Sequence, residues 1–168
     1  GHARAEAGWR GHALTGGAAD ALRRRTIVIL EDDERRIAAM REVLAAGFAD
    51  HPLFLLWDAP KMIAWLRQHL GEVALLSLDN DLIDPNEVAT DLGEGRDVAD
   101  YLAGLAPAFP VVLHTSNSGA AFTMSETLRE RGWSVSRVVP MNDIEWIHGL
   151  WARRLGQLLR RGAESGRP

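Results

Sequence analysis

The stretch TIVILEDDE at residues 26–34 decides the fold, because apolar residues give way to acidic ones within a few positions. Thr26 to Leu30 are β-branched or apolar without interruption, which is typical of a parallel strand covered on both faces. Glu31, Asp32 and Asp33 follow directly. Carboxylates at the end of a buried strand are costly unless they are paired or bound to a metal. The stretch therefore predicts a strand that delivers acids to a site.

Two later stretches repeat this arrangement. The sequence SLDNDL at residues 77–82 follows the apolar run that starts at Val73, and it places Asp79 and Asp81 close together. Residues 114–117, with the sequence HTSN, follow the apolar residues 110–113. In open parallel sheets, ligands bind at the carboxyl ends of the strands. We therefore expect these polar residues to converge on one pocket.

Between these stretches, strand patterns alternate strictly with helical ones. Strands are expected at 26–30, 53–57, 73–78, 110–113 and 133–139, and helices at about 34–46, 58–70, 96–105, 119–131 and 143–160. This alternation predicts an α/β three-layer sandwich with right-handed crossovers. The expected sheet has five parallel strands in the order 2-1-3-4-5, which makes strands one, three and four neighbours.

Length and composition indicate one intracellular domain. We expect a domain at residues 26–161, an N-terminal extension at 1–25 and a C-terminal tail at 162–168. The sequence has no cysteine and a net charge of -4, which disfavours disulfides, thiolate metal sites and general DNA binding. The longest apolar runs are far shorter than the roughly 20 residues that cross a bilayer. A cytoplasmic protein without membrane partners is expected.

The chemistry of the expected pocket favours a hard cation. Two carboxylates about 4 Å apart repel by roughly 4 kcal/mol at an effective dielectric near 20. Oxygen ligands without cysteine favour Mg²⁺, which commonly binds one or two carboxylates and a substrate phosphate. We therefore expect a phosphate-bearing ligand. Each acidic cluster also has a plainer interpretation as a helix start or a turn, and His114 as a core histidine.

The order of VILEDD, LLSLDND and VVLHTS on this alternation resembles the receiver domain of two-component response regulators, over about residues 26–160. The resemblance implies that Asp32, Asp33 and Asp79 bind Mg²⁺, that Asp79 is the phosphoacceptor position, and that Thr115 is the switch hydroxyl. Receivers carry a lysine before a proline at the end of strand five, whereas Val139 precedes Pro140 here. That departure argues against switching by phosphorylation.

A divergent branch, the cyclic-phosphate processing receiver-like domains, is a closer resemblance. Its LDHDLG-like, Gly-x-Asp-Val and HSxN-like segments correspond to LDNDLI at 78–83, GRDVADYL at 95–102 and HTSNSGA at 114–120. Asn80 stands where that branch usually has a histidine, and Ile83 replaces a glycine. If that histidine takes part in chemistry, this copy is weakened or inactive. The resemblance implies a role in handling cyclic phosphates on nucleotides or RNA ends.

Three functions follow as hypotheses. The first is a Mg²⁺-dependent domain that binds a phosphate-bearing small molecule or RNA end and, if it is an enzyme, hydrolyses a phosphoester. Asp79 and His114 would then be catalytic, with His114 as general acid or base. The second is a stand-alone response regulator that a histidine kinase phosphorylates on Asp79, and the third is a non-catalytic pseudo-receiver. The expected phosphate-binding residues are Thr115, Ser116 and Asn117.

Overall fold

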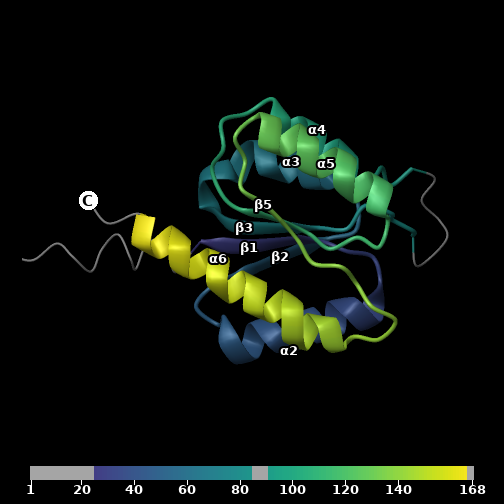
Figure 1. Ribbon diagram of the computed structural model, residues 1–168, viewed down its shortest axis with the longest axis vertical. Coiled ribbons are helices and arrows are strands. Elements are labelled where there is room, and N and C mark those ends of the chain that lie inside the picture. The colour runs from purple at the N-terminus through teal and green to yellow at the C-terminus, as the bar shows by residue number, and fades with distance from the viewer. Residues whose placement is uncertain (1–24, 85–90, 166–168) are drawn as a thin grey trace, which may run out of the picture.

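A five-stranded parallel sheet forms the centre of the protein in the computed structural model, which describes residues 25–84 and 91–165 (Figure 1). The strands are β1 (Thr26–Leu30), β2 (Leu53–Leu56), β3 (Val73–Leu78), β4 (Val111–Leu113) and β5 (Val135–Arg137). Their order is β2-β1-β3-β4-β5, and every neighbouring pair is parallel. The predicted fold and strand order are confirmed.

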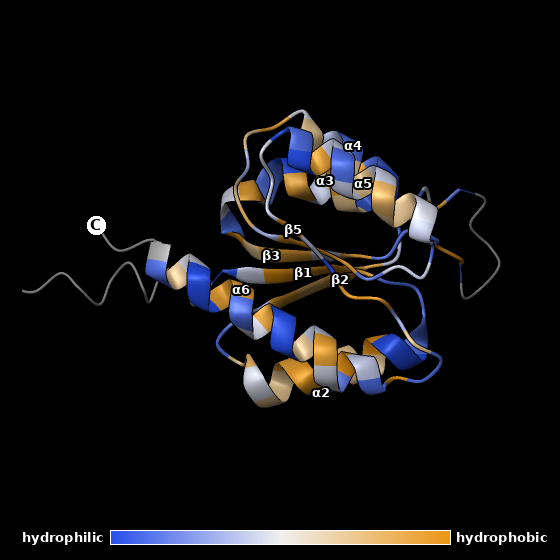
Figure 2. Cartoon of the chain, in the orientation of Figure 1, coloured by the Kyte–Doolittle hydropathy of each residue, from blue (hydrophilic) through white to orange (hydrophobic). Residues whose placement is uncertain are grey.

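Helices cover both faces of this sheet (Figure 1). One face carries α3 (Ala59–His69), α4 (Gly95–Ala103) and α5 (Ser118–Glu130), and the other carries α2 (Glu34–Gly47) and α6 (Ala152–Ser165). A short 3₁₀ turn, η1 (Leu70–Glu72), precedes β3, and a single π-helical turn, η2 (Ile147–Trp151), leads into α6. Orange apolar stripes on the helices turn toward the sheet in Figure 2, as expected for amphipathic covering helices.

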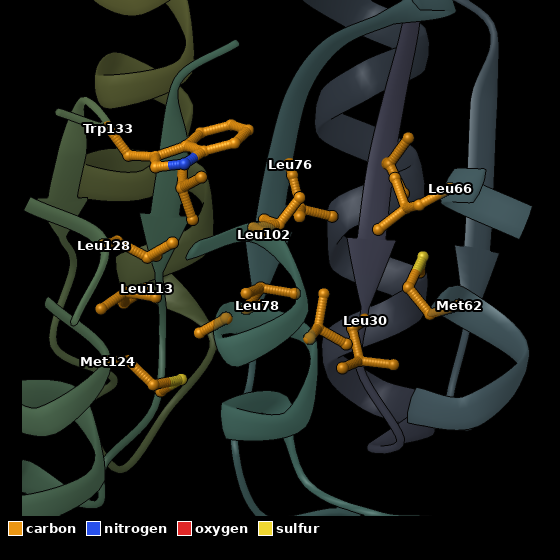
Figure 3. Packing of buried hydrophobic residues seen from close by; sticks show 14 of the residues in the cluster. Leu30, Met62, Leu66, Leu76, Leu78, Leu102, Leu113, Met124, Leu128 and Trp133 are labelled. Carbon is orange, nitrogen blue, oxygen red and sulfur yellow. The ribbon is translucent and has the colours of Figure 1, made fainter. Parts of the chain in front are cut away.

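The continuous apolar character of β1 has a direct packing cause. Val28 and Leu30 belong to the core between the sheet and α3, α4 and α5, part of which Figure 3 shows. Ile27 and Ile29 belong to the second core, against α2, η2 and α6. Successive side chains of a strand point to opposite faces, so a strand covered twice needs apolar residues at every position.

Several element boundaries differ from the sequence-based expectation. Strand β5 is shorter than the predicted 133–139, because the Trp133 N–H donates to Leu128 O at the end of α5 and its ring packs in the core. The last predicted helix is divided by the π turn η2, and α6 continues past residue 160 to Ser165. Strand β2 ends at Leu56, leaving Trp57 41% exposed.

The predicted N-terminal extension lies outside the described residues except for Arg25. Residues 166–168 of the predicted tail are outside them as well. Within residues 25–84 and 91–165, none of the helices combines the length and apolar character needed to cross a bilayer.

Candidate functional site

Strand register brings three polar residues to the same level at the carboxyl edge of the sheet. Leu30 pairs with Leu78, and Leu78 pairs with Leu113. The next residue of each strand is therefore Glu31, Asp79 or His114. The ladder continues through them, because the Asp79 N–H donates to Leu30 O and the His114 N–H donates to Leu78 O, both at 2.9 Å.

Three carboxylates gather at this edge and form what we call the acid group: Glu31, Asp32 and Asp79. One oxygen from each lies within 4.8 Å of the others, a spacing at which all three can contact one metal ion. Glu31 is fully buried, Asp79 is 5% exposed and Asp32 is partly buried. The predicted convergence of the acids after β1 and β3 is therefore present in the structure.

The side chain of Asp33 is used differently. It is exposed and caps helix α2, with Oδ1 accepting the N–H groups of Arg35 at 2.9 Å and Arg36 at 3.0 Å. The structure therefore does not bring Asp33 into the acid group. Glu31 takes that place, because the chain turns from strand to helix within the acidic run and only its first two acids face the site.

Burial and mutual repulsion perturb the acid group. Burial raises the pKa of Asp32 to about 6, with the charges of Glu31 and Asp79 adding to the effect and the Ile83 N–H opposing it. Burial also raises the pKa of Asp79, and the Glu31 charge raises it further. His114, the Asn80 N–H and Arg36 act in the opposite direction, but the pKa stays above its ordinary value. A cation bound here would relieve both penalties.

Glu31 behaves in the opposite way. Burial raises its pKa, but the hydrogen bond from His114, the Asp33 N–H and the Arg36 guanidinium together lower it below the ordinary value. Glu31 Oε1 accepts the N–H groups of Asp32 at 3.1 Å and Asp33 at 3.0 Å, and Oε2 lies 3.1 Å from His114 Nε2. Glu31 is therefore held as a carboxylate within the acid group.

A buried chain of hydrogen bonds runs from Trp151 through Ser77 and His114 to Glu31. Trp151 Nε1 donates to Ser77 Oγ at 3.0 Å, and Ser77 Oγ lies 2.7 Å from His114 Nδ1. An indole N–H can only donate, so Ser77 accepts from Trp151 and can donate its own hydrogen to Nδ1. This assignment, inferred from the network, leaves Nε2 of His114 as the donor to Glu31. The fully buried His114 thus has both ring nitrogens occupied.

Arg36, in the first turn of α2, is the cation beside the acid group. Its Nη1 lies 3.3 Å from Asp79 Oδ2 and 3.6 Å from Glu31 Oε2. Its Cζ is 5.7 Å from the centroid of the buried Trp146 ring, which is itself 6.2 Å from the His114 ring. Trp146 therefore lies next to the site as well as in the core.

The predicted phosphate-binding residues divide between buried and exposed positions. Thr115 is fully buried, and its Oγ1 accepts the Asn117 N–H at 3.1 Å. Ser116 and Asn117 are exposed. Asn117 caps α5 through the Ala120 N–H at 3.0 Å and donates from Nδ2 to Asp81 Oδ1 at 3.3 Å. Of the three, the Ser116 hydroxyl is the group most open to a ligand.

The start of α4 is fixed directly against Asp79. The Gly95 N–H donates to Asn80 O at 2.9 Å, and a Cβ on Gly95 would lie 1.9 Å from Asp79 O. Asn80 is buried, and its Oδ1 accepts the Arg96 N–H at 3.1 Å while its Nδ2 donates to Asp81 Oδ1 at 2.9 Å. In this chain Asn80 therefore joins the end of β3 to the start of α4.

Sequence reasoning missed the residues that support the acids. Ser77 could have been noticed as the polar residue within the otherwise apolar strand VALLSL, which must find a buried partner. No signal in the sequence distinguishes Arg36 from Arg35, or Trp151 from the other tryptophans.

These observations define a class of protein: a doubly wound α/β domain of the receiver type with an acidic site at the carboxyl ends of its strands. The sequence matches the family described as the cyclic-phosphate processing receiver domain over residues 27–130. The chain belongs to this family. Among curated proteins, none matches the sequence.

Solved structures similar to this chain are response-regulator receivers. The phosphorylated cyanobacterial phytochrome response regulator RcpA has a TM-score of 0.64 and 17% identity, with 81% of this chain and 94% of that chain covered. A receiver domain from Rhodospirillum rubrum has a TM-score of 0.56 and 18% identity, with 80% of this chain and 90% of that chain covered. The Mn²⁺-bound form of response regulator Rcp1 has a TM-score of 0.55 and 19% identity, with 79% of this chain and 90% of that chain covered. At these identities the likeness establishes the receiver fold.

Proposed function

We propose that this domain binds a divalent cation, Mg²⁺ in the cell, through Glu31, Asp32 and Asp79, and that the bound cation recruits a phosphate-bearing ligand. The observation that carries the proposal is the close approach of one oxygen from each acid, within 4.8 Å. An all-carboxylate donor set fits a hard cation. The metal would neutralise the acids and polarise a phosphate or a bound water.

Calorimetric titration with Mg²⁺ tests the metal site. Asp32→Asn and Asp79→Asn each remove one charge from the acid group, and we expect each to weaken Mg²⁺ binding by about tenfold or more. Asp33→Asn is the matched control, because it removes the same charge one residue away and an asparagine still caps a helix. Equal loss in Asp33→Asn would restore Asp33 as a ligand, and no Mg²⁺ binding to the wild type would refute the site.

The reaction proposed is hydrolysis of a cyclic phosphate on a nucleotide or an RNA end. Water adds to phosphorus, one ring P–O bond breaks, and the leaving oxygen takes a proton, giving a phosphomonoester. The family assignment and the acid group support this choice. Ser116 is exposed three residues after the end of β4, and we expect its hydroxyl to contact the phosphate. Phosphorus NMR of a cyclic nucleotide incubated with protein and Mg²⁺ tests the reaction, and an unchanged spectrum would refute it.

The position of His114 gives its predicted role a specific test. Its ring is buried and both nitrogens are hydrogen-bonded, which favours positioning of Glu31 over direct proton transfer to a ligand. His114→Gln keeps a donor for Glu31 but cannot act as general acid or base at neutral pH. Preserved Mg²⁺ binding with preserved turnover supports positioning. Preserved binding with lost turnover supports the acid or base role predicted from the sequence.

Phosphorylation of Asp79 by a histidine kinase is the second candidate. Asp79 directly follows β3, at the position that the likeness to receivers gives to the phosphoacceptor, and its Oδ1 accepts the Asn80 N–H at 2.7 Å. Treatment with a small phosphoryl donor, followed by intact-mass measurement, tests it. An adduct on the wild type that is absent from Asp79→Asn supports this function, and no adduct argues against it. If the protein shows neither Mg²⁺ binding nor an adduct, the non-catalytic pseudo-receiver is the function that remains.

A further inference from the structure

Arg36 reaches the acid group from helix α2, and the helix start holds it there. Its backbone N–H donates to the Asp33 cap, which fixes the first turn of the helix. Its guanidinium then contacts Asp79 at 3.3 Å and Glu31 at 3.6 Å, with the Trp146 ring on one side. Among the arginines and the lysine in the described part of the chain, only Arg36 forms an ion pair with the acid group.

The same carboxylates serve two cations. Glu31 and Asp79 belong to the acid group that can contact one metal ion, and both are also ion-paired with Arg36. A guanidinium stays protonated at any physiological pH, so it cannot lose its charge when a metal arrives. It can only move, and its side chain is 24% exposed, which leaves a direction toward solvent.

We propose that Arg36 competes with the divalent cation for Glu31 and Asp79, and that its release on metal binding makes it the phosphate-binding cation of the site. This inference rests on the proposed function. Arg36 then couples the two ligands, because the metal displaces the guanidinium and the phosphate gives it a new partner.

The distribution of basic residues supports the second part of this proposal. Lys61 is the only lysine in the sequence, and it lies on α3 with its side chain 73% exposed and paired with Asp58. Val139 precedes Pro140 after β5, so that strand end supplies no amine. An arginine offers five N–H donors in a planar fork that matches phosphate oxygens. Arg36 is placed beside Asp79 to use this fork.

The first measurement is Mg²⁺ affinity without any anion ligand, by calorimetry, in the wild type, Arg36→Met and Arg35→Met. Arg35 is exposed and adjacent, so Arg35→Met removes the same charge without freeing the acid group. We expect Arg36→Met to bind Mg²⁺ at least about fivefold more tightly than Arg35→Met, because a competing positive charge has been removed. Equal affinities in the two variants would overturn the competition.

The second measurement is the affinity for inorganic phosphate at saturating Mg²⁺. We expect Arg36→Met to bind phosphate about tenfold or more weakly than Arg35→Met, and Arg36→Lys to fall between them because it keeps the charge but loses the fork. Equal phosphate affinities would overturn the anion role. If only Arg36→Met binds Mg²⁺, the competition is supported and the proposed function of the wild type fails. If no variant binds Mg²⁺, both fail.

Discussion

Ser77 joins Trp151 to His114, and its removal gives the sharpest test of the buried chain. The hydroxyl is fully buried and accepts the indole N–H at 3.0 Å while lying 2.7 Å from His114 Nδ1. Ser77→Ala leaves the Trp151 indole N–H and His114 Nδ1 buried without their partner. Trp151→Phe removes the donor instead, so Ser77 and His114 can keep their bond.

The magnitudes follow from these partners. A buried polar group left without a partner costs about 1–3 kcal/mol, so we expect Ser77→Ala to lower the free energy of unfolding by about 2–4 kcal/mol. Trp151→Phe costs about 1–3 kcal/mol through the space left by the smaller ring. In the double variant the indole N–H is absent, so only His114 Nδ1 is left without its partner. The double variant should therefore be about 1–2 kcal/mol more stable than the two single effects predict.

Urea denaturation of the wild type, both single variants and the double variant measures this coupling. Ser136→Ala in strand β5 is a control for loss of a strand hydroxyl, because Ser136 does not belong to the hydrogen-bond chain from Trp151 to Glu31. Additivity of the two substitutions to within about 0.5 kcal/mol would refute the reasoning, since residues that share a hydrogen bond should not behave independently.

Three further predictions concern the acid group and its supports. In metal-free protein, burial raises the pKa of Asp32 to about 6 in the folded state, above the ordinary value of about 4. The folded state therefore binds more protons than the unfolded state between these pH values, and stability should fall as pH rises through that window. Asp32→Asn should weaken this dependence in urea melts at a series of pH values. Gly95→Ala should destabilise the domain by about 2–3 kcal/mol or more and weaken Mg²⁺ binding by moving Asp79, whereas Gly71→Ala, with open space around it, should change stability by under about 0.5 kcal/mol. Asp33→Ala should lower the free energy of unfolding by about 1 kcal/mol, because helix α2 loses its cap. If Asp33→Ala weakened Mg²⁺ binding as much as Asp79→Asn does, the assignment of Asp33 as a helix cap outside the acid group would be wrong.

The sequence carries most of the information about the sheet, because burial on both faces leaves a simple pattern. Thr26 to Leu30 form β1 with the predicted boundaries, and the residues after β1, β3 and β4 meet as expected. Asp58 caps α3 at the start of the helix predicted at about 58–70, with Oδ1 accepting the Lys61 N–H at 2.8 Å. These features depend on local rules of strand periodicity, helix capping and parallel register.

The supporting residues depend on packing that no local rule describes. Glu31, Asp32 and Asp33 are chemically similar, and which of them face the site depends on where the chain starts its helix. Ser77 and Trp151 are 74 positions apart, and their contact depends on how the π turn and α6 lie against the sheet. Sequence periodicity predicts that Trp151 is buried, but it gives no partner for the indole N–H.

The close approach of Gly95 to Asp79 also has an evolutionary consequence. The connection from β3 to α4 leaves the end of the strand at Asn80 and comes back to it at Gly95, the first residue of α4, where the Gly95 N–H donates to Asn80 O at 2.9 Å. The closure of such a loop becomes costlier only slowly with its length, by about 0.6 kcal/mol for each doubling. Insertions between these two residues can therefore accumulate in evolution while the carboxylate of Asp79 stays in place.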